Sequence, residues 1–517
     1  MTPPVEQRRH EGWLVALLLA LPLLAFLLRL GAAPLFDVDE GAFSEATREM
    51  FERGDFLSTY LNGEHRFDKP ILVYWLQALS YLALGPTEWA FRLPSALAAI
   101  GWCYATWLFV RQRFGQDTAL LALGIAATAL GPFAIGRAAT ADALLNLLLA
   151  LTLFDAWRHL ESGRRTPLLR AFVWMGLGAL TKGPIALIVP SAVTFLYCAS
   201  RGDWRRWARA VFDPLGWLIL ALIVLPWYVA ALSIHGQLFI DGFFLKHNVQ
   251  RFAGTLEGHG GSALYYLIAV PLLLLPWSGP FFAALRNVRD DSRTSVRRFL
   301  WIWSGFVVLF FSLSGTKLPH YVLYGITPLF ILIAAHRDTL RRAWLHLAAP
   351  SLLLAVFPAL PWIFSALSNS TAGDAYYRAQ LGRALELADA RYYIGTLAAL
   401  LIWIVVMLRW RQALWKRLVV AAALQVTVLA ALVVPYAGAL VQGPVRDMAI
   451  KLREMDEAVT LKSFTAPSFS VYRQAVTQRE EPAPGGLAVT RIDRIPQTGY
   501  DTLAIEGGVA LVRRHTE

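Results

Sequence analysis

Long apolar runs constrain this chain more than any other feature of its sequence. Runs such as residues 13–30, 215–232 and 263–277 recur along most of its length. A helix needs about 20 apolar residues to cross the hydrocarbon core of a bilayer, and these runs approach that length. Of the 517 residues, 56% are hydrophobic and only 16% are charged, far from the usage of a soluble domain. The sequence therefore predicts a polytopic membrane protein.

Lysine and arginine gather in short gaps between the apolar runs, at every second crossing. These gaps hold Arg8-Arg9, Arg111/Arg113, Arg164-Arg165, Arg205-Arg206, Arg297-Arg298, Arg341-Arg342 and Arg409/Arg411 with Lys416-Arg417. The spacing follows the positive-inside rule and predicts a cytoplasmic N-terminus. It also explains the formal net charge of +12, so nucleic-acid binding has no support beyond charge.

The runs predict an all-α membrane domain followed by a small mixed domain. We expect about thirteen spans within residues 1–440, the first at residues 12–30, which is too long for a cleaved signal peptide alone. From residue 441 the long apolar runs vanish, and alternation at 487–489 and 509–512 indicates strands. Residues 441–517 are therefore expected to form a small α/β domain, on the outer side if the span count is odd.

The first outer loop, residues 31–89, carries the clearest chemical signal. Asp37, Asp39 and Glu40 follow the first apolar run, and Asp68-Lys69 lies further along. Residues 39–53 are expected to form an amphipathic helix, and the apolar stretch 71–84 an interfacial or re-entrant helix. Acids beside a membrane are costly unless they face water, a cation or a ligand, so the loop indicates a site. The alternative is a solvated loop with a capped helix, which leaves Lys69 unexplained.

Acids and bases recur on the other predicted outer loops as well. They are Arg137/Asp142, Lys182, His247/Arg251/His259 and Lys317/His320/Tyr321. Gathered on one face, they indicate a single composite site built from several loops. Carboxylates suit general-base chemistry or metal binding, whereas lysine and arginine suit a phosphate. Each residue alone has a simpler explanation: lysines can reach lipid head groups, Asp142 can cap a helix, Arg251 can bind lipid phosphate, and His259 can be solvated.

Several segments resemble, in order, the aminoarabinose transferase-like glycosyltransferases, which have the C-type (GT-C) fold and are related to protein mannosyltransferases. The segments are Asp39-Glu40-Gly41-Ala42-Phe43, Arg48-Glu49-Met50, Leu61-Asn62-Gly63, Asp68-Lys69-Pro70, Trp89-Ala90-Phe91-Arg92-Leu93-Pro94, Thr140-Ala141-Asp142, Thr181-Lys182-Gly183-Pro184, Asn248-Val249-Gln250-Arg251-Phe252 and Lys317-Leu318-Pro319-His320-Tyr321. The resemblance covers most of residues 12–335.

The resemblance implies transfer of a sugar, such as 4-amino-4-deoxy-L-arabinose, from undecaprenyl phosphate to an acceptor at the periplasmic face of the bacterial inner membrane. The acceptor would be lipid A, another glycolipid, a glycan or a protein. In this reading Asp39 is the catalytic acidic residue, with Glu40 beside it and Asp142 as the acid of the second loop. The donor phosphate would be held by Lys69, Arg251, Tyr321 and Lys317.

Asp68 and His259 match positions associated with a divalent metal (Zn²⁺, Mg²⁺ or Mn²⁺), although Asp68 stands where the family usually has Glu. Because Lys and Arg already serve the phosphate, no cofactor is obligatory. This chain also has Gly41, Ala42 and Phe43 where the best-known members read Ala-Arg-Tyr, which leaves the acceptor open.

The other function considered is a transporter or flippase of a lipid-linked sugar, which should place polar residues at mid-membrane in broken helices. A structural scaffold, the third possibility, predicts no such clustering.

Overall fold

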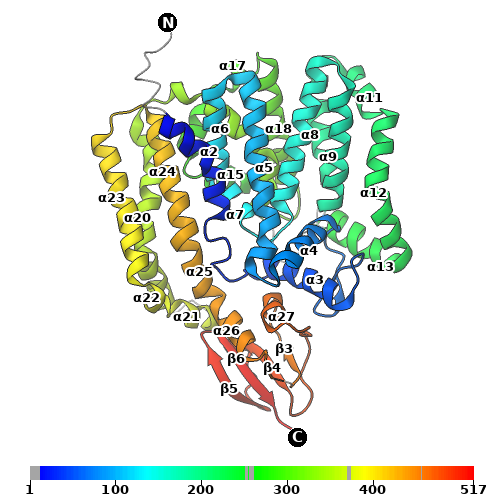
Figure 1. The fold of residues 1–517 in the computed structure, drawn as a ribbon, viewed down its shortest axis with the longest axis vertical. Coiled ribbons are helices and arrows are strands. Elements are labelled where there is room, and N and C mark those ends of the chain that lie inside the picture. Colours follow the sequence, from blue (N-terminus) through cyan, green and yellow to red (C-terminus); the bar gives the residue numbers. More distant parts are fainter. Residues whose placement is uncertain (1–11, 251–253, 255–260, 370–373, 456, 517) are drawn as a thin grey trace.

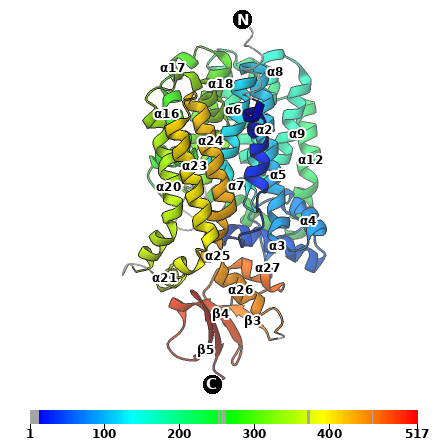
Figure 2. The same ribbon diagram turned by 60° about the vertical axis from the view of Figure 1, so that its left-hand side comes forward.

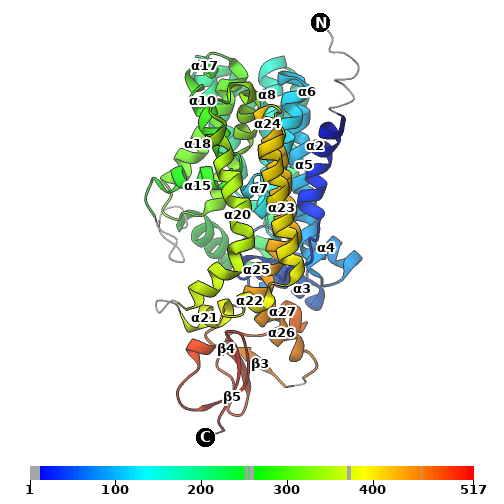
Figure 3. The ribbon, with the colours of Figure 1, turned by 90° about the vertical axis from the view of Figure 1, so that its left-hand side faces the viewer.

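Apolar helices stand side by side and make up most of the molecule (Figures 1 and 2). The computed structural model describes residues 12–250, 254, 261–369, 374–455 and 457–516. A small sheet domain lies at one end of the helices, and the described N-terminal helix begins near the other end (Figure 3). The predicted helical membrane domain with a small C-terminal α/β domain is confirmed, while the boundary at residue 441 stays a prediction.

Seven helical stretches in the described part of the chain are long and apolar enough to cross a membrane. They are α5 (Glu88–Phe114), α8 (Asp142–Ser162), α12 (Pro214–His235), α18 (Ser295–Ser312), α20 (Ala343–Ser368), α23 (Ala390–Arg409) and the stretch Leu414–Val441, which comprises α24 (Leu414–Val428), η4 (Leu429–Val433) and α25 (Val434–Val441). A bent pair, α6 (Gln116–Thr128) and α7 (Leu130–Gly136), would make an eighth. The chain is thus a multi-pass membrane protein.

The remaining predicted spans fall on helices that are shorter, less apolar or interrupted. These helices are α2 (Gly12–Leu27), α9 (Arg165–Lys182), α10 (Ile185–Ala199), α15 (Tyr265–Leu273), α16 (Ser278–Leu285) and α19 (Thr327–Ala335). Short connecting helices are α11 (Trp204–Val211), α13 (Gln237–Phe239), η1 (Ile240–Gln250), α17 (Val288–Asp291), η2 (Pro319–Gly325), η3 (Arg337–Thr339), α21 (Ala375–Leu381) and α22 (Ala384–Leu387). The total of about thirteen spans therefore stays a prediction.

The first outer loop folds into two helices joined by a short hairpin. Helix α3 (Asp39–Arg53) has the predicted bounds, and it ends where Gly54 adopts a left-handed φ of 67°. The hairpin pairs β1 (Tyr60–Leu61) with β2 (Glu64–His65) in antiparallel register. Helix α4 (Leu72–Leu84) buries Tyr74 and Gln77 and exposes Leu79 and Leu82. Its apolar outer face suits the predicted place at a membrane interface.

Buried tryptophans connect the helices behind this loop. The indole of Trp102, on α5, donates to Thr327 Oγ1 at 2.9 Å. The indole of Trp303, on α18, donates to the carbonyl oxygen of Tyr324 at 2.7 Å. Both rings are fully buried, and both bonds reach η2 or the start of α19. The 3₁₀ segment η2 is therefore held firmly against the membrane helices.

The C-terminal domain begins with helix α26 (Gly443–Lys451) and contains a four-stranded sheet of order β3-β4-β6-β5. Its elements are β3 (Val459–Leu461), α27 (Pro467–Arg473), β4 (Leu487–Arg491), η5 (Ile492–Arg494), β5 (Tyr500–Glu506) and β6 (Val509–Arg514). β3 and β4 are parallel and the other pairs antiparallel. The predicted strands at 487–489 and 509–512 are confirmed. Helix α27 turns away from the sheet and toward α3 (Figure 1).

Candidate active site at the C-terminal-domain end of the helices

Asp39 is the first residue of α3, and its side chain is exposed. Acids in the first turn of a helix interact favourably with its dipole, which is one reason the helix starts here. Helices α3, α4 and α27 all lie at the end of the bundle that carries the sheet domain, whereas α11 and α17 lie at the opposite end (Figure 1). Asp39 thus stands at the surface of the end opposite the basic connections of α11 and α17.

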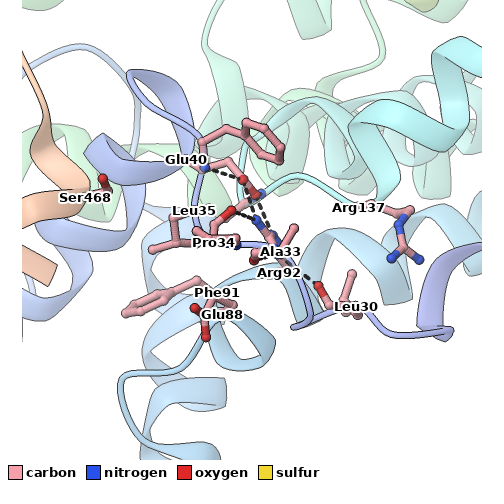
Figure 4. A network of polar contacts seen from close by, with 12 residues as sticks. Leu30, Ala33, Pro34, Leu35, Glu40, Glu88, Phe91, Arg92, Arg137 and Ser468 are labelled. Carbon is pink, nitrogen blue, oxygen red and sulfur yellow. Dashed lines mark hydrogen bonds and ion pairs between the residues drawn. The ribbon is translucent and has the colours of Figure 1, made fainter. Parts of the chain in front are cut away.

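Glu40, the next residue, has entirely different surroundings (Figure 4). Its carboxylate accepts from Arg92 Nε at 2.8 Å and Nη2 at 2.7 Å, and from the backbone N–H groups of Phe36 and Ala139 at 2.9 and 2.8 Å. The two charged side chains are only 5% and 3% exposed. Both oxygens are occupied, so we infer that Glu40 is a structural anchor and not the catalytic group that the sequence suggested.

Arg92 completes this anchor on the other side. Its guanidinium also donates to the carbonyl oxygens of Leu30 and Ala33 at 3.0 and 2.7 Å and of Pro34 at 2.8 Å (Figure 4). The chain between α2 and α3 is therefore tied to α5. A buried carboxylate–guanidinium pair with every partner in place fixes geometry more than it adds stability.

Asp68 lies between two cations from the same loop. Its carboxylate accepts from Arg66 Nη2 at 2.6 Å and from Lys69 Nζ at 2.6 Å. Arg66 Nε also contacts the hydroxyl of Tyr74 at 3.2 Å, which links the group to α4. In the part of the chain that the structure describes, no three metal-ligating side chains gather. The predicted metal-associated partner, His259, lies outside the described residues, so the metal prediction remains untested.

Asp142 is the first residue of α8 and is paired with two other elements. Its Oδ1 accepts from Lys182 Nζ, at the end of α9, at 2.6 Å. The same oxygen accepts from the hydroxyl of Tyr324, on η2, at 3.0 Å. Its carboxylate therefore joins the start of α8 to the end of α9 and to η2, more than the simple helix cap that was the alternative explanation.

His320, on η2, interacts electrostatically with both Asp39 and Asp142. Burial lowers its pKa to about 4; the charges of Asp142 and Asp39 oppose that shift, while Lys182 and Lys69 add to it. The first loop also packs on the ends of α8 and α9, because Phe43, Ala141 and Leu180 belong to one buried cluster. The common site predicted for Asp39, Lys69 and Asp142 remains a prediction, which these electrostatic interactions with His320 support.

The remaining predicted phosphate-binding residues lie on or next to η2, or outside the described residues. Tyr321 is 9% exposed, and its ring centroid lies 5.9 Å from Lys182 Nζ. Lys317 is buried and donates to the carbonyl oxygen of Ser314 at 2.7 Å. Arg251 lies outside the described residues, so its place in the site stays a prediction.

Several residues of this site were given no role from the sequence. They are Arg66, Tyr74, Arg92, Tyr324 and, although noted on the outer loops, Lys182 and His320. Arg66 had one local signal, its position two residues before Asp68. Tyr74 binds Arg66, which is near it in the chain. The others are recognised only through partners far away in the chain, and the sequence alone does not reveal such partners.

Comparison with known proteins agrees with this architecture. Residues 68–229 match the family described as dolichyl-phosphate-mannose-protein mannosyltransferase. The undecaprenyl phosphate-alpha-4-amino-4-deoxy-L-arabinose arabinosyl transferase of Pectobacterium carotovorum is 31% identical over 66% of this chain and 64% of its own length. That of Erwinia tasmaniensis is 32% identical over 60% of this chain and 57% of its own length. The chain thus spans less than two thirds of these relatives.

Among solved structures, ArnT from Cupriavidus metallidurans bound to undecaprenyl phosphate aligns with 97% of this chain and 98% of its own, with a TM-score of 0.80 and 21% identity. The same protein in the apo state also gives a TM-score of 0.80. The resemblance stated from the sequence is confirmed, and the chain has the C-type fold of these transferases.

Proposed function

We propose that this chain is an integral membrane glycosyltransferase that moves a sugar from undecaprenyl phosphate to a lipid or glycan acceptor. One observation supports the proposal: the start of α3, which carries Asp39, packs on the ends of α8 and α9, where Lys182 binds Asp142, in a fold shared with a protein crystallised with undecaprenyl phosphate. The sequence relatives are named as arabinosyl transferases, which makes 4-amino-4-deoxy-L-arabinose the sugar to test first and lipid A the acceptor to test first.

The chemistry follows from the charges in the site. The bond between the anomeric carbon and the phosphate oxygen breaks, and its electron pair leaves with the phosphate. Lys69, Tyr321 and Lys317, together with Arg251, would stabilise that departing charge. The acceptor oxygen bonds to the anomeric carbon from the opposite face, which inverts its configuration.

Asp39 would serve the acceptor. If the acceptor is a hydroxyl, exposed Asp39 takes its proton as a general base. If it is a phosphate oxygen, no strong base is needed and Asp39 orients it. Asp142, held by Lys182 and Tyr324, would place those side chains near the donor. No metal is required in this scheme; Asp68 with His259 remains the pair that would hold one.

We also propose that the N-terminus is cytoplasmic and that the site and the C-terminal domain face the periplasm. The short basic connections of α11 and α17 lie at the end opposite the sheet domain (Figure 1). Cytoplasmic loops carry the excess of lysine and arginine. This orientation lets a lipid-anchored donor reach the site from the outer leaflet.

The test compares envelope lipids from cells with wild-type protein, with the deletion and with Asp39→Asn. We expect mass spectrometry to find one sugar-modified lipid that both the deletion and Asp39→Asn lose, while the variant protein stays at wild-type amount. Asp117→Asn is the matched control, because Asp117 is an exposed acid at the start of α6.

A flippase would give another result. Asp39→Asn would then behave as wild type, and the deletion alone would leave the lipid-linked sugar on the inner leaflet. That outcome would exclude the transferase.

A further inference from the structure

Helix α27 of the C-terminal domain packs on α3, the helix that begins with Asp39. The two lie side by side in Figures 1 and 2. Three successive alternate residues of α27, Ser468, Ser470 and Tyr472, each bond to the first outer loop or its neighbours. The contact therefore involves most of the helix and not one chance bond.

The first of these contacts is made by Asp37, two residues before Asp39. Asp37 Oδ1 accepts from the backbone N–H of Ser468 at 2.9 Å, and Oδ2 accepts from the Ser468 hydroxyl at 2.5 Å. Ser468 is fully buried, and Figure 4 shows it beside the segment that carries Glu40. Burial raises the pKa of Asp37 to about 7, although both bonds from Ser468 oppose that shift.

The approach of the two segments is close enough to require glycine at position 41. A Cβ there would lie 2.2 Å from Asp37 Oδ1 and 2.5 Å from the backbone nitrogen of Ser468. Neither distance is tolerable, so even alanine would push α27 away. Asp37 and Gly41 thus contact α27 on both sides of Asp39.

Tyr472 fixes the chain before Asp37. Its hydroxyl accepts from the backbone N–H of Leu35 at 2.7 Å and donates to Glu88 Oε1, at the start of α5, at 3.0 Å. Val471 packs with Leu35, Phe91 and Ala139 in one buried cluster. α27 therefore holds the segment 35–41 from outside, while Arg92 holds it from the membrane side through Glu40.

We propose that α27 positions Asp39 for transfer, with Asp37 and Ser468 as positioning residues and the C-terminal domain as part of the active-site structure. The inference rests on the proposed function for its catalytic consequence. Asp37 itself does not react: both oxygens are bonded to Ser468. A displacement of about 1 Å in a reacting group can lower a rate about 100-fold, so a contact that fixes the segment before Asp39 affects transfer.

The experiment compares Asp37→Ala with Asp37→Asn in the full-length protein. Asparagine can still accept from the Ser468 N–H, and the Ser468 hydroxyl can rotate to accept from its amide. We expect Asp37→Asn to retain product formation within about threefold of wild type, and Asp37→Ala to lose about 100-fold in kcat. Binding of undecaprenyl phosphate alone should change little in either, because Lys69 and Tyr321 lie on other elements.

Ser468→Ala and Ser470→Ala form a second matched pair. Both serines are fully buried on α27, and the Ser470 hydroxyl donates at 2.8 Å to Asn62 Oδ1, which lies in the β1–β2 turn and not in the segment that carries Asp39. We expect Ser468→Ala to lower kcat and Ser470→Ala to leave it within about twofold. Equal losses in both would show general undocking of α27 and overturn the specific role of Ser468.

Hydrogen exchange of residues 35–44 gives a readout that needs no substrate. Asp37→Ala should exchange faster there and Asp37→Asn should not; unchanged exchange in Asp37→Ala would overturn the proposal. If Asp37→Asn lost turnover as fully as Asp39→Asn, Asp37 would be a catalytic group instead. If Asp39→Asn left the lipids unchanged, the proposed function would fail, while the exchange result would still report on the α27 contact.

Discussion

At the scale of residues, neighbouring acids of one loop have opposite surroundings. Asp39 is exposed at the start of α3, and Glu40 is buried with four hydrogen-bond donors. The residue type cannot separate the two, because both are carboxylates beside a membrane segment. What separates them is Arg92, which lies 52 residues further along and reaches Glu40 only in the fold.

Arg92→Met should leave the Glu40 carboxylate buried without its cation. Breaking a buried pair in this way costs about 3–5 kcal/mol, so we expect a clearly lower melting temperature for the purified protein. Arg293→Met is the control, because the Arg293–Asp290 pair is 3.8 Å long and highly exposed. Its loss should cost less than about 1 kcal/mol. Equal melting temperatures for the two variants would contradict the anchoring role of Glu40.

His320 should make the protein sensitive to acid. Its pKa is about 4 in the fold and 6.5 in an ordinary setting, so below about pH 6.5 the unfolded chain takes up a proton that the folded chain refuses. The stability contributed by neutral His320 is present above that pH and is lost as the pH falls toward 4. We expect thermal unfolding to show a smaller decline between pH 7 and pH 5 for His320→Gln than for wild type. An equal decline in the stability of wild type and His320→Gln would show that His320 is not shielded from protonation.

The grouping of Asp39, Lys69 and Asp142 was predicted because the expected spans bring the loops that carry them to one side of the membrane. Their common site stays a prediction. The bonds of Lys182 and Tyr324 to Asp142 were not predictable, since they depend on which helices are neighbours. The roles predicted for Arg251 and His259 remain predictions.

At the scale of elements, local signals gave α3 its bounds. Acids stand in its first turn and Gly54 stops it, and neither signal depends on the rest of the fold. The bend between α6 and α7 lies directly before Gly131-Pro132, a residue pair that disfavours a continuous helix.

The bend is stabilised by a second interruption nearby. The backbone N–H of Leu130 donates to the carbonyl oxygen of Leu275, between α15 and α16, at 2.9 Å. The indole of Trp277 donates to Thr128 Oγ1 at 2.9 Å. Non-helical backbone inside a membrane is tolerated where another part of the protein satisfies it. The segment between α15 and α16 thus supplies hydrogen-bond partners to the break between α6 and α7. Only the tertiary structure shows that these two segments are neighbours.

At the scale of the whole molecule, the two ends should differ in accessibility. Thr498→Cys lies in the C-terminal domain and Thr166→Cys at the start of α9, and both threonines are exposed. We expect a membrane-impermeant maleimide to label Thr498→Cys in intact spheroplasts and Thr166→Cys only after lysis. Wild type is the blank, because Cys103 and Cys198 are buried. Labelling of Thr166→Cys before lysis would reverse the proposed orientation.

The bonds between Asp37 and Ser468 join residues 431 positions apart. A ribosome makes Asp37 early and Ser468 only after every membrane helix has been made. Asp39 therefore acquires its second support late in synthesis, after the helices between have been inserted and α27 has crossed to the same side. A partly made chain could occupy the membrane and carry every acid and base of the site, yet lack the contact that places them. On the proposed function, we therefore expect transfer activity only from chains whose C-terminal domain is complete.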